Sequence, residues 1–263
     1  MIHSTAIVSP SARIGKNVRI GPYSVIGDIV ELEDDVEIMS HVCVSGHTRV
    51  GKGTRIFPFA SIGYEPQDLK YKGEESQLII GKRNTIREYV TVHPGTAEDS
   101  MKTVVGDDNL FMISVHIAHD CIIGNNIVMG NNATLGGHVK IGDNAIIGGM
   151  TAIHQRVRIG RLAVIGGMSG VEKDVIPYGA VKGDRAYLYD VNIVGLRRAN
   201  VERKEILALK KAYETIFFGP KTLSENLTEA EQETSGASCV YHLLDFMKNG
   251  TNRSFCSPRE QWK

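Results

Sequence analysis

Aliphatic residues recur at every sixth position near the N-terminus, and this period constrains the fold more than any other feature. From Ile2 to Ile62 each sixth residue is Ile, Leu or Val, without exception. Helices repeat about every 3.6 residues and simple strands every 2, so neither explains the spacing. A coil of short strands does explain it. Each hexad then supplies one strand and one turn, three hexads make a triangular coil, and the aliphatic residue points inward.

The period returns twice further along the chain. The run from Ile80 to Val92 keeps the phase of the first run, and a longer run from Val105 to Val171 is shifted by one residue. The three runs together predict roughly nine coils. Between them we expect two loops that leave the prism, near residues 63–79 and 94–104, and loops on a rigid scaffold are where sites are commonly built.

Glycine follows the aliphatic residue in many hexads, as at Gly15, Gly21 and Gly142. Because glycine adopts positive φ without a steric penalty, we expect these residues to turn the chain at the corners of the prism.

Helical patterns replace the repeat after Pro177. Apolar residues recur at helical spacings over residues 200–217, with Asn200 as the expected N-cap. Thr222 and Glu225 form a capping-box pattern that opens a second helix. A third apolar stripe comprises Val240, Leu243, Leu244 and Met247.

These patterns divide the chain into two domains. Residues 1–189 are expected to form the hexapeptide-repeat β-helix, and residues 190–263 a helical domain that covers its open C-terminal end. The polar tail, residues 251–263, is expected to fray.

Composition excludes several classes of function. Thirty Lys and Arg balance thirty Asp and Glu, and the pI is about 7.1, so no global field favours nucleic acid or an anionic membrane. The four cysteines are far apart in the sequence, which suits a reducing compartment. With no apolar span long enough to cross a bilayer and no signal sequence, we expect a soluble, cytoplasmic protein.

Four of the nine histidines lie in the third run: His116, His119, His138 and His154. A surface position is the simpler explanation for any single histidine, but a cluster favours chemistry. His119 and His138 are about one coil apart, which predicts a separation of ~4.8 Å along the prism. Asp120 directly follows His119 and could orient its ring, as general base catalysis requires.

Two further polar segments stand out. The first predicted loop contains Gln67, Asp68 and Lys70, which a solvated loop would explain equally well. The segment from Asn192 to Arg198 begins a basic region that includes Arg197, Arg203, Lys204, Lys210 and Lys211. Such a region is usually a solvated helix face, but it also suits a phosphate-bearing ligand or an acidic partner.

Several motifs in this order resemble the acyl-[acyl-carrier-protein]–UDP-N-acetylglucosamine O-acyltransferase family. They are Gln67–Tyr71, His116–Cys121, Asn131–Leu135 followed by Gly137 and His138, Ile147–Ala152, His154 with Gln155, and Asn192–Arg198. The resemblance covers nearly the whole chain and weakens after about Gly219. Val194 and Ala199 depart from it, because the family often has Glu and a second basic residue there.

The resemblance implies a left-handed parallel β-helix that forms a homotrimer, with active sites between neighbouring prisms. It implies transfer of an (R)-3-hydroxyacyl group to the glucosamine 3-hydroxyl of UDP-N-acetylglucosamine, the first step of lipid A biosynthesis. The donor is acyl carrier protein with its 4'-phosphopantetheine arm, and no other cofactor or metal is implied.

The resemblance also assigns roles to residues. His119 matches the general base, Asp120 supports its ring, and the backbone N–H of Gly137 meets the oxyanion, without an acyl-enzyme. Gly167 matches an acyl-chain ruler and, as glycine, implies a long chain near fourteen carbons. The residues implied to bind substrate are Gln67, Asp68, Lys70, His116, His138, His154, Gln155, Asn192 and Arg198.

Three alternatives remain. Trimeric β-helices of the carbonic anhydrase class hold zinc through histidines, although that class has a pair of His five apart and His116 and His119 are three apart. An N-acyltransferase of the same pathway has a similar repeat but usually an extra N-terminal domain, whereas this repeat begins at Ile2. A β-helix that serves only as a scaffold would have no reason to cluster histidines.

Overall fold

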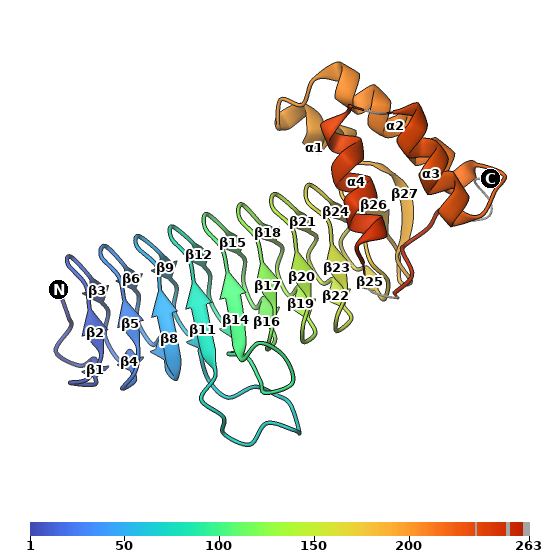
Figure 1. Ribbon diagram of the computed structural model, residues 1–263. Helices are drawn as coiled ribbons and strands as arrows, with labels where there is room; N and C mark the ends of the chain where they lie inside the picture. Colours follow the sequence, from blue (N-terminus) through green and yellow to red (C-terminus); the bar gives the residue numbers. More distant parts are fainter. Residues whose placement is uncertain (235, 251–252, 260–263) are drawn as a thin grey trace.

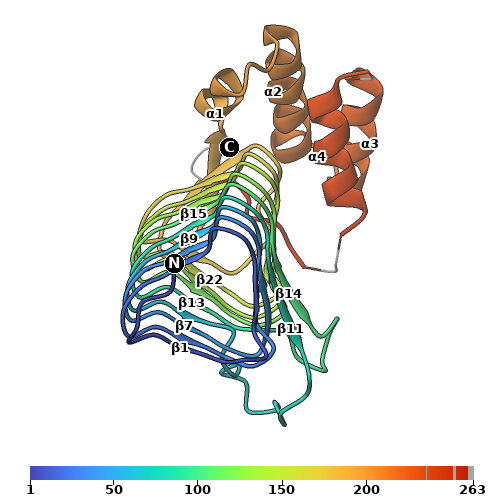
Figure 2. The same ribbon diagram turned by 90° about the vertical axis from the view of Figure 1, so that its left-hand side faces the viewer.

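The computed structural model describes residues 1–234, 236–250 and 253–259. Short strands wind into a left-handed parallel β-helix of triangular cross-section, which confirms the predicted fold class. Figure 1 shows this prism from the side, with the N-terminus at one end and the helices at the other. Figure 2 shows it along its axis.

Three parallel sheets form the faces of the prism. The first face consists of β1 (Ile7–Val8), β4 (Val25–Ile26), β7 (Cys43–Val44), β10 (Ser61–Ile62), β13 (Thr91–Val92), β16 (His116–Ile117), β19 (Thr134–Leu135), β22 (Ala152–Ile153) and β25 (Gly170–Val171). The second face consists of β2 (Arg13–Ile14), β5 (Glu31–Leu32), β8 (His47–Val50), β11 (Gln77–Ile80), β14 (Lys102–Val105), β17 (Ile122–Ile123), β20 (Lys140–Ile141) and β23 (Arg158–Ile159). The third face consists of β3 (Arg19–Ile20), β6 (Glu37–Ile38), β9 (Arg55–Ile56), β12 (Thr85–Ile86), β15 (Leu110–Phe111), β18 (Val128–Met129), β21 (Ile146–Ile147) and β24 (Val164–Ile165), followed by a hairpin.

The register of the strands places residues of successive coils directly above one another. On the first face Ile117 pairs with Leu135, and Leu135 pairs with Ile153. These side chains point into the prism and are buried, whereas Thr134 and Ala152, one position earlier, are exposed. The aliphatic residue of each hexad therefore fills a continuous core, as the period predicts.

The corners use glycine differently from the sequence-based expectation. Positive φ occurs mainly at other residues, such as Asn17 (57°) and Tyr23 (59°), and not at Gly15 or Gly21. A Cβ on Gly15 would lie 2.7 Å from the backbone N of Asp34 in the next coil. The expectation of positive φ at these glycines was therefore wrong. They are needed because successive coils leave no room for a side chain.

Both predicted excursions are present, and both leave the corner between the first and second faces, which we call the first corner. Figures 1 and 2 show them projecting together from that corner. The chain re-enters the second face on β11 and β14, which are four residues long and pair in register, Gln77 with Lys102. β11 begins at Gln77 and β14 at Lys102, so each strand starts two residues before the predicted end of its loop, residue 79 for the first loop and residue 104 for the second.

After β25 the stack continues as an antiparallel hairpin of β26 (Gly179–Lys182) and β27 (Tyr187–Val191). The domain boundary proposed after residue 189 lies within β27. Among the described residues the helices that follow are α1 (Ile193–Arg198), α2 (Arg203–Phe218), α3 (Leu223–Glu233) and α4 (Ser238–Lys248). Figures 1 and 2 show them beside the last coils, so the hairpin, and not a helix, extends the prism at this end.

Helix boundaries test the capping predictions. The Thr222 and Glu225 capping box is confirmed at the start of α3. The prediction that Asn200 caps α2 was wrong, because this helix begins at Arg203 with Glu202 as its N-cap residue. Asn200 instead has φ 55°, outside the conformation of an N-cap. The apolar stripe of the third predicted helix is buried on α4.

A clasp joins α4 to the last coils. The Arg158 guanidinium binds the buried Asp174 carboxylate at 2.7 Å, donates to the carbonyl of Phe246 at 3.2 Å, and lies over the Phe246 ring. The tail crosses the same place, because Phe255 forms a bridge with Asp174. The expectation of fraying was therefore wrong for residues 253–259, which pack against the prism; residues 251–252 and 260–263 lie outside the described residues. Within the described ranges, each helix is too short or too polar to cross a membrane.

Candidate active site

His119 and Asp120 meet at the first corner, directly after β16. Nδ1 of His119 lies 2.8 Å from Oδ2 of Asp120. An ionised carboxylate can only accept, so Nδ1 carries the proton and Nε2 of His119 has the free lone pair. This tautomer is the one that a general base requires.

Asp120 is buried and fully hydrogen-bonded. Thr96, from the second excursion, donates its backbone N–H to Oδ1 at 3.0 Å and its hydroxyl to Oδ2 at 2.7 Å. Burial would raise the pKa of Asp120, but the hydrogen bonds from His119 and Thr96 outweigh it and hold that pKa below its usual range. Asp120 is therefore ionised at neutral pH and can stabilise an imidazolium at His119.

Gly137 lies one coil beyond His119, beneath its ring. A Cβ on Gly137 would lie 2.5 Å from Cε1 and 2.6 Å from Nε2 of His119, so glycine alone allows this approach. Within the described residues, the buried N–H of Gly137 has no hydrogen-bond acceptor. The His119 ring, with its free Nε2 lone pair, thus lies against the backbone of Gly137, whose N–H is available as a donor.

The predicted one-coil spacing of His119 and His138 is confirmed, because their ring centroids are 5.0 Å apart, edge to face. His138 is one position later in its coil, which is why Gly137 and not His138 lies under His119. Nδ1 of His138 is 3.0 Å from Oδ2 of Asp99, and Nε2 is 3.3 Å from Nη2 of Arg156.

The first excursion contributes Asp68, whose Oδ2 lies 3.7 Å from Nε2 of His119. Lys70 forms an exposed ion pair with Glu98 of the second excursion at 2.8 Å, and Gln67 is also exposed. The two excursions therefore meet over the first corner and partly cover the imidazoles.

His116 lies on the first face, beside the corner. Its Nδ1 is 2.7 Å from the Thr91 hydroxyl, and its ring lies against that of His93. Burial, together with the neighbouring His93 and His119, lowers the pKa of His116 to about 4. His154 and Gln155 lie one coil beyond Gly137 at the same corner, and both are exposed.

Asn192 and Arg198 are not brought to His119 within one chain. They line a cavity of about 460 Å³ at a different corner, between the second and third faces. There the amide of Asn192 donates to the carbonyl of Leu162 at 2.8 Å and its oxygen caps α1 by accepting from the Gly195 N–H. Val194 is exposed at the same cavity.

Gly167 lies at the third corner, between the third and first faces. Its φ is not in the left-handed region, whereas the next residue, Met168, has φ 58°. A Cβ on Gly167 would lie 3.1 Å from the carbonyl oxygen of Gly149 and would otherwise have room. The backbone conformation therefore does not require glycine here, although a side chain would press on the Gly149 carbonyl oxygen of the preceding coil.

In the part of the chain that the structure describes, one group of side chains could geometrically hold a cation. Ligand atoms of His119, Asp120 and His138 lie within 4.8 Å of one another. Asp120 already accepts hydrogen bonds from Thr96 and His119, however, and Nδ1 of His138 faces Asp99. The donor set is thus arranged as hydrogen-bonded pairs.

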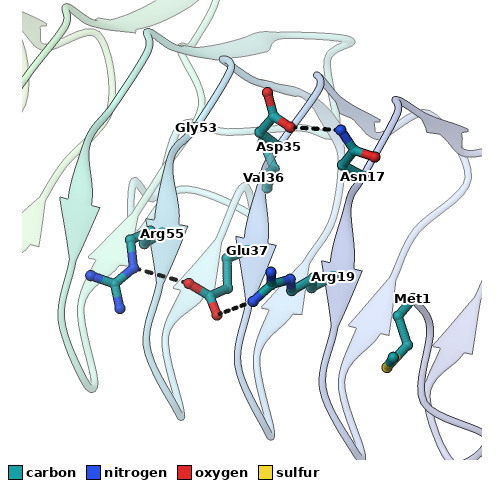
Figure 3. Close-up of a pocket in the computed structure, with 8 residues that line it drawn as sticks. All are labelled: Met1, Asn17, Arg19, Asp35, Val36, Glu37, Gly53 and Arg55. Carbon is teal, nitrogen blue, oxygen red and sulfur yellow. Dashed lines mark hydrogen bonds and ion pairs between the residues drawn. The ribbon is translucent and has the colours of Figure 1, made fainter.

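A second hollow lies on the third face near the N-terminus. This cavity has a volume of about 540 Å³. Figure 3 shows Glu37 between Arg19 and Arg55, with a dashed line to each. Its Oε2 accepts from Nε of Arg55 at 3.0 Å, and Nη1 of Arg19 is 3.9 Å from Oε1. Glu37 thus shares its charge between two exposed arginines.

Sequence reasoning missed three residues of this site: Thr96, Asp99 and Arg156. Arg156 follows His138 by one coil, so the period could have identified it. Thr96 and Asp99 lie on an excursion whose path the period does not predict.

Comparisons with known proteins agree with the predicted resemblance. A family model described as UDP-N-acetylglucosamine O-acyltransferase, domain 2, matches residues 174–256, and one described as bacterial transferase hexapeptide (six repeats) matches residues 102–137. The acyl-[acyl-carrier-protein]–UDP-N-acetylglucosamine O-acyltransferase of Thermodesulfovibrio yellowstonii is 48% identical over 97% of this chain and 98% of its own. The enzyme of the same name from Rhizobium johnstonii is 45% identical over 98% of this chain and 94% of its own.

Solved structures give the same result. LpxA from Acinetobacter baumannii is 41% identical and superposes with a TM-score of 0.94. The match covers 97% of this chain and 99% of the LpxA chain. The chain therefore belongs to the family of acyl-[acyl-carrier-protein]–UDP-N-acetylglucosamine O-acyltransferases.

Proposed function

We propose that the first corner catalyses transfer of an (R)-3-hydroxyacyl group from acyl carrier protein to the glucosamine 3-hydroxyl of UDP-N-acetylglucosamine, the first step of lipid A biosynthesis. One observation carries this proposal: the His119 ring, with a free Nε2 lone pair, lies against the backbone of Gly137, whose N–H has no acceptor among the described residues. A base beside an oxyanion donor is the arrangement that acyl transfer requires.

In the proposed reaction Nε2 of His119 removes the proton of the sugar hydroxyl as the oxygen attacks the thioester carbonyl. The new C–O bond forms, and the carbonyl oxygen becomes an oxyanion that accepts a hydrogen bond from the Gly137 N–H. The C–S bond then breaks, and the imidazolium returns its proton to the departing pantetheine thiolate. Asp120 stabilises the imidazolium in between, so no acyl-enzyme is needed.

Asp68 supports this cycle from the first excursion. At 3.7 Å from Nε2 of His119, its carboxylate lies beside the proton that the ring takes up in the reaction and is placed to accept a hydrogen bond from the sugar. We propose that Gln67, Lys70, His116, His138, His154 and Gln155 line the sugar nucleotide and pantetheine sites, because they lie at the first corner, beside it, or on the excursion that covers it.

Asn192 and Arg198 require a second chain. They lie at another corner of the prism, so one chain alone does not bring them to His119. In a homotrimer with sites between neighbouring prisms, the corner of one chain could face the first corner of the next. We propose that these two residues then bind the nucleotide diphosphate.

The donor is proposed to dock on the basic region that begins at α1. Arg197, Arg203 and Lys210 are exposed there, whereas Lys204 and Lys211 have acidic neighbours in Glu202 and Glu233. The acyl chain would extend along the first face toward Gly167. The exposed side chains between the two corners, Thr134 and Ala152, are small.

A zinc-dependent reaction is the second candidate, because His119, Asp120 and His138 could coordinate a cation. Elemental analysis of the purified protein distinguishes the two. Stoichiometric zinc that is needed for activity would favour the metal reaction, and activity retained after treatment with a chelator would favour proton transfer by His119.

Mass spectrometry of the reaction products tests the proposed function directly. Purified protein is given UDP-N-acetylglucosamine, its 3-amino analogue, and a mixture of 3-hydroxyacyl carrier proteins. We expect an O-acylated sugar nucleotide with a chain near fourteen carbons. If only the 3-amino analogue is acylated, the acceptor group is a 3-amino group and not a 3-hydroxyl. If neither sugar nucleotide is acylated, the proposal is contradicted.

A further inference from the structure

Asp99, on the second excursion, makes a contact that the proposed reaction does not use. Its Oδ2 lies 3.0 Å from Nδ1 of His138, while Nη2 of Arg156 lies 3.3 Å from Nε2. A guanidinium can only donate, so Nε2 of His138 accepts and Nδ1 carries the proton. The two contacts therefore select one neutral tautomer of His138, with its N–H directed at Asp99.

The carboxylate of Asp120 is a second possible acceptor for the Nδ1–H of His138. Nδ1 of His138 is 3.9 Å from Oδ2 of Asp120. That oxygen already accepts from Nδ1 of His119 at 2.8 Å and from the hydroxyl of Thr96 at 2.7 Å. Without Asp99, the N–H of His138 would turn toward Asp120 and compete with His119 for it.

Hydrogen bonds of the second excursion hold Asp99 close to His138. Thr96, three residues earlier, is fully buried and bonds to both oxygens of Asp120. The side chain of His138 is only 6% exposed, so its orientation depends on its polar neighbours. The charged or titratable groups that contact it are Asp99, Asp120, Arg156 and His119.

We infer that Asp99 is a positioning residue for acyl transfer. It accepts the hydrogen bond from the Nδ1–H of His138, which leaves Asp120 to orient His119. It also presents the Nε2 lone pair of His138 to an N–H or O–H group of the substrate, once the exposed Arg156 side chain moves aside. This inference rests on the proposed function, since it assigns Asp99 a part in that reaction.

Three single variants test it. Asp99→Ala should lower kcat about tenfold, because the orienting hydrogen bond is lost. Asp99→Asn should recover most of that loss, since its amide oxygen can accept the same hydrogen bond. Glu75→Ala removes an equal charge from an exposed position of the first excursion and should match the wild type. Equal kinetics for Asp99→Ala and Glu75→Ala, or equal losses for Asp99→Ala and Asp99→Asn, would overturn the inference.

A double-mutant cycle shows whether Asp99 acts through His138. In a His138→Ala background, Asp99→Ala should change kcat less than twofold, since the two residues act as one unit. A full tenfold loss in that background would contradict the role.

The pH profile of kcat/KM supplies a readout that a merely structural role would not move. The acidic limb of this profile reports protonation of the proposed base, His119, in the free enzyme. Removing the Asp99 carboxylate takes away a negative charge that favours the imidazolium form of His119. Asp99→Ala should therefore shift this limb to lower pH, whereas Glu75→Ala should not. An unshifted limb in Asp99→Ala would count against the inference.

A wild type without transferase activity would refute the proposed function and not this contact. In that event the ¹⁵N spectrum of the His138 imidazole decides. A proton on Nδ1 in the wild type, with an Nδ1 chemical shift that changes in Asp99→Ala but not in Glu75→Ala, supports the positioning role, and a proton on Nε2 in the wild type overturns it.

Discussion

Two groups of charged side chains are built by the same stacking of coils: Arg19, Glu37 and Arg55, which we call the ladder, and His119, Asp120 and His138, which we call the covered cluster. Only the covered cluster is arranged for chemistry. Glu37 pairs with arginines one coil before and one coil after it, and its side chain remains 32% exposed. Asp120 is paired with His119 and is 0% exposed, because the second excursion covers it. Stacking of coils brings charged side chains together on both faces. Only where an excursion covers such a group, as at Asp120, are the side chains buried and held in one arrangement.

The environment decides what each carboxylate can do. An exposed ion pair is screened by water and contributes ~0–1 kcal/mol. A buried carboxylate with several hydrogen bonds holds its neighbours in one geometry, because breaking the network leaves an unpaired charge. Five predictions, taken in decreasing order of expected effect, test whether this difference holds.

Removing the base should break the covered cluster most severely. His119→Ala, or His119→Asn with similar volume, should lower kcat about 10²–10⁴-fold, the usual contribution of a positioned base. Steady-state kinetics and circular dichroism measure activity and folding. Glu37→Gln, the matched change in the ladder, should keep wild-type kcat. Near-normal activity of a folded His119→Ala protein would rule His119 out as the base.

Gly167→Met tests whether the specificity of the site extends across the first face. About 0.8 kcal/mol is lost for each methylene that can no longer be buried. Excluding two to four methylenes should shift chain selectivity by one to two orders of magnitude or more, toward chains of roughly ten carbons. Competition between 3-hydroxyacyl carrier proteins of different length measures the shift. Unchanged preference in a folded trimer would show that Gly167 does not set the chain length.

His116 should make the stability of the covered cluster depend on pH. Its pKa is lowered from 6.5 to about 4 in the folded protein. Below pH 6.5 the unfolded chain takes up a proton that the folded chain refuses, so the free energy of unfolding falls as pH drops toward 4. Urea titrations of wild type and His116→Gln should show a shallower fall in the variant. Parallel curves would mean that His116 is not the cause.

Salt should distinguish charges that face a partner from charges that face one another. Donor KM should rise a few-fold between low and high ionic strength, because acidic acyl carrier protein would be steered by Arg197, Arg203 and Lys210. KM for the sugar nucleotide should change less. A donor KM that stays flat would argue against this docking surface.

The ladder itself should yield the smallest effect. Glu37→Gln should lower the free energy of unfolding by ~0–1 kcal/mol at low salt, and the difference should vanish at high salt. Denaturant titrations at two ionic strengths measure it. A larger loss that persists in salt would place the ladder among the buried networks and remove the contrast with Asp120.

The period of six predicts the prism because each aliphatic position reports burial directly, as at Leu135 and Ile153. The same spacing brings His119 within reach of His138, and adjacency in the sequence brings it to Asp120. Local chemistry likewise identifies the capping box at Thr222. These features depend on short-range patterns or on the fixed length of a coil.

What the sequence did not reveal depends on contacts without a period. The path of the second excursion brings Asp99 to His138 across 39 positions, and no spacing rule predicts it. The role of Gly15 was misread because its constraint comes from Asp34 in the next coil and not from its own backbone. The position of Asn192 at a separate corner follows from the hairpin of β26 and β27, which redirects the chain.

The stacking of coils also gives the molecule two unequal ends. The first coil lies at the edge of the stack, where β1 ends the first face and pairs with β4. The opposite end is held by the hairpin and by the clasp of Arg158 with Asp174. In such a one-dimensional array, local opening is least costly where a unit has a single neighbour. Amide protection should therefore increase along the axis from β1 inward, which places the first corner at His119 in the slowly exchanging middle of the array.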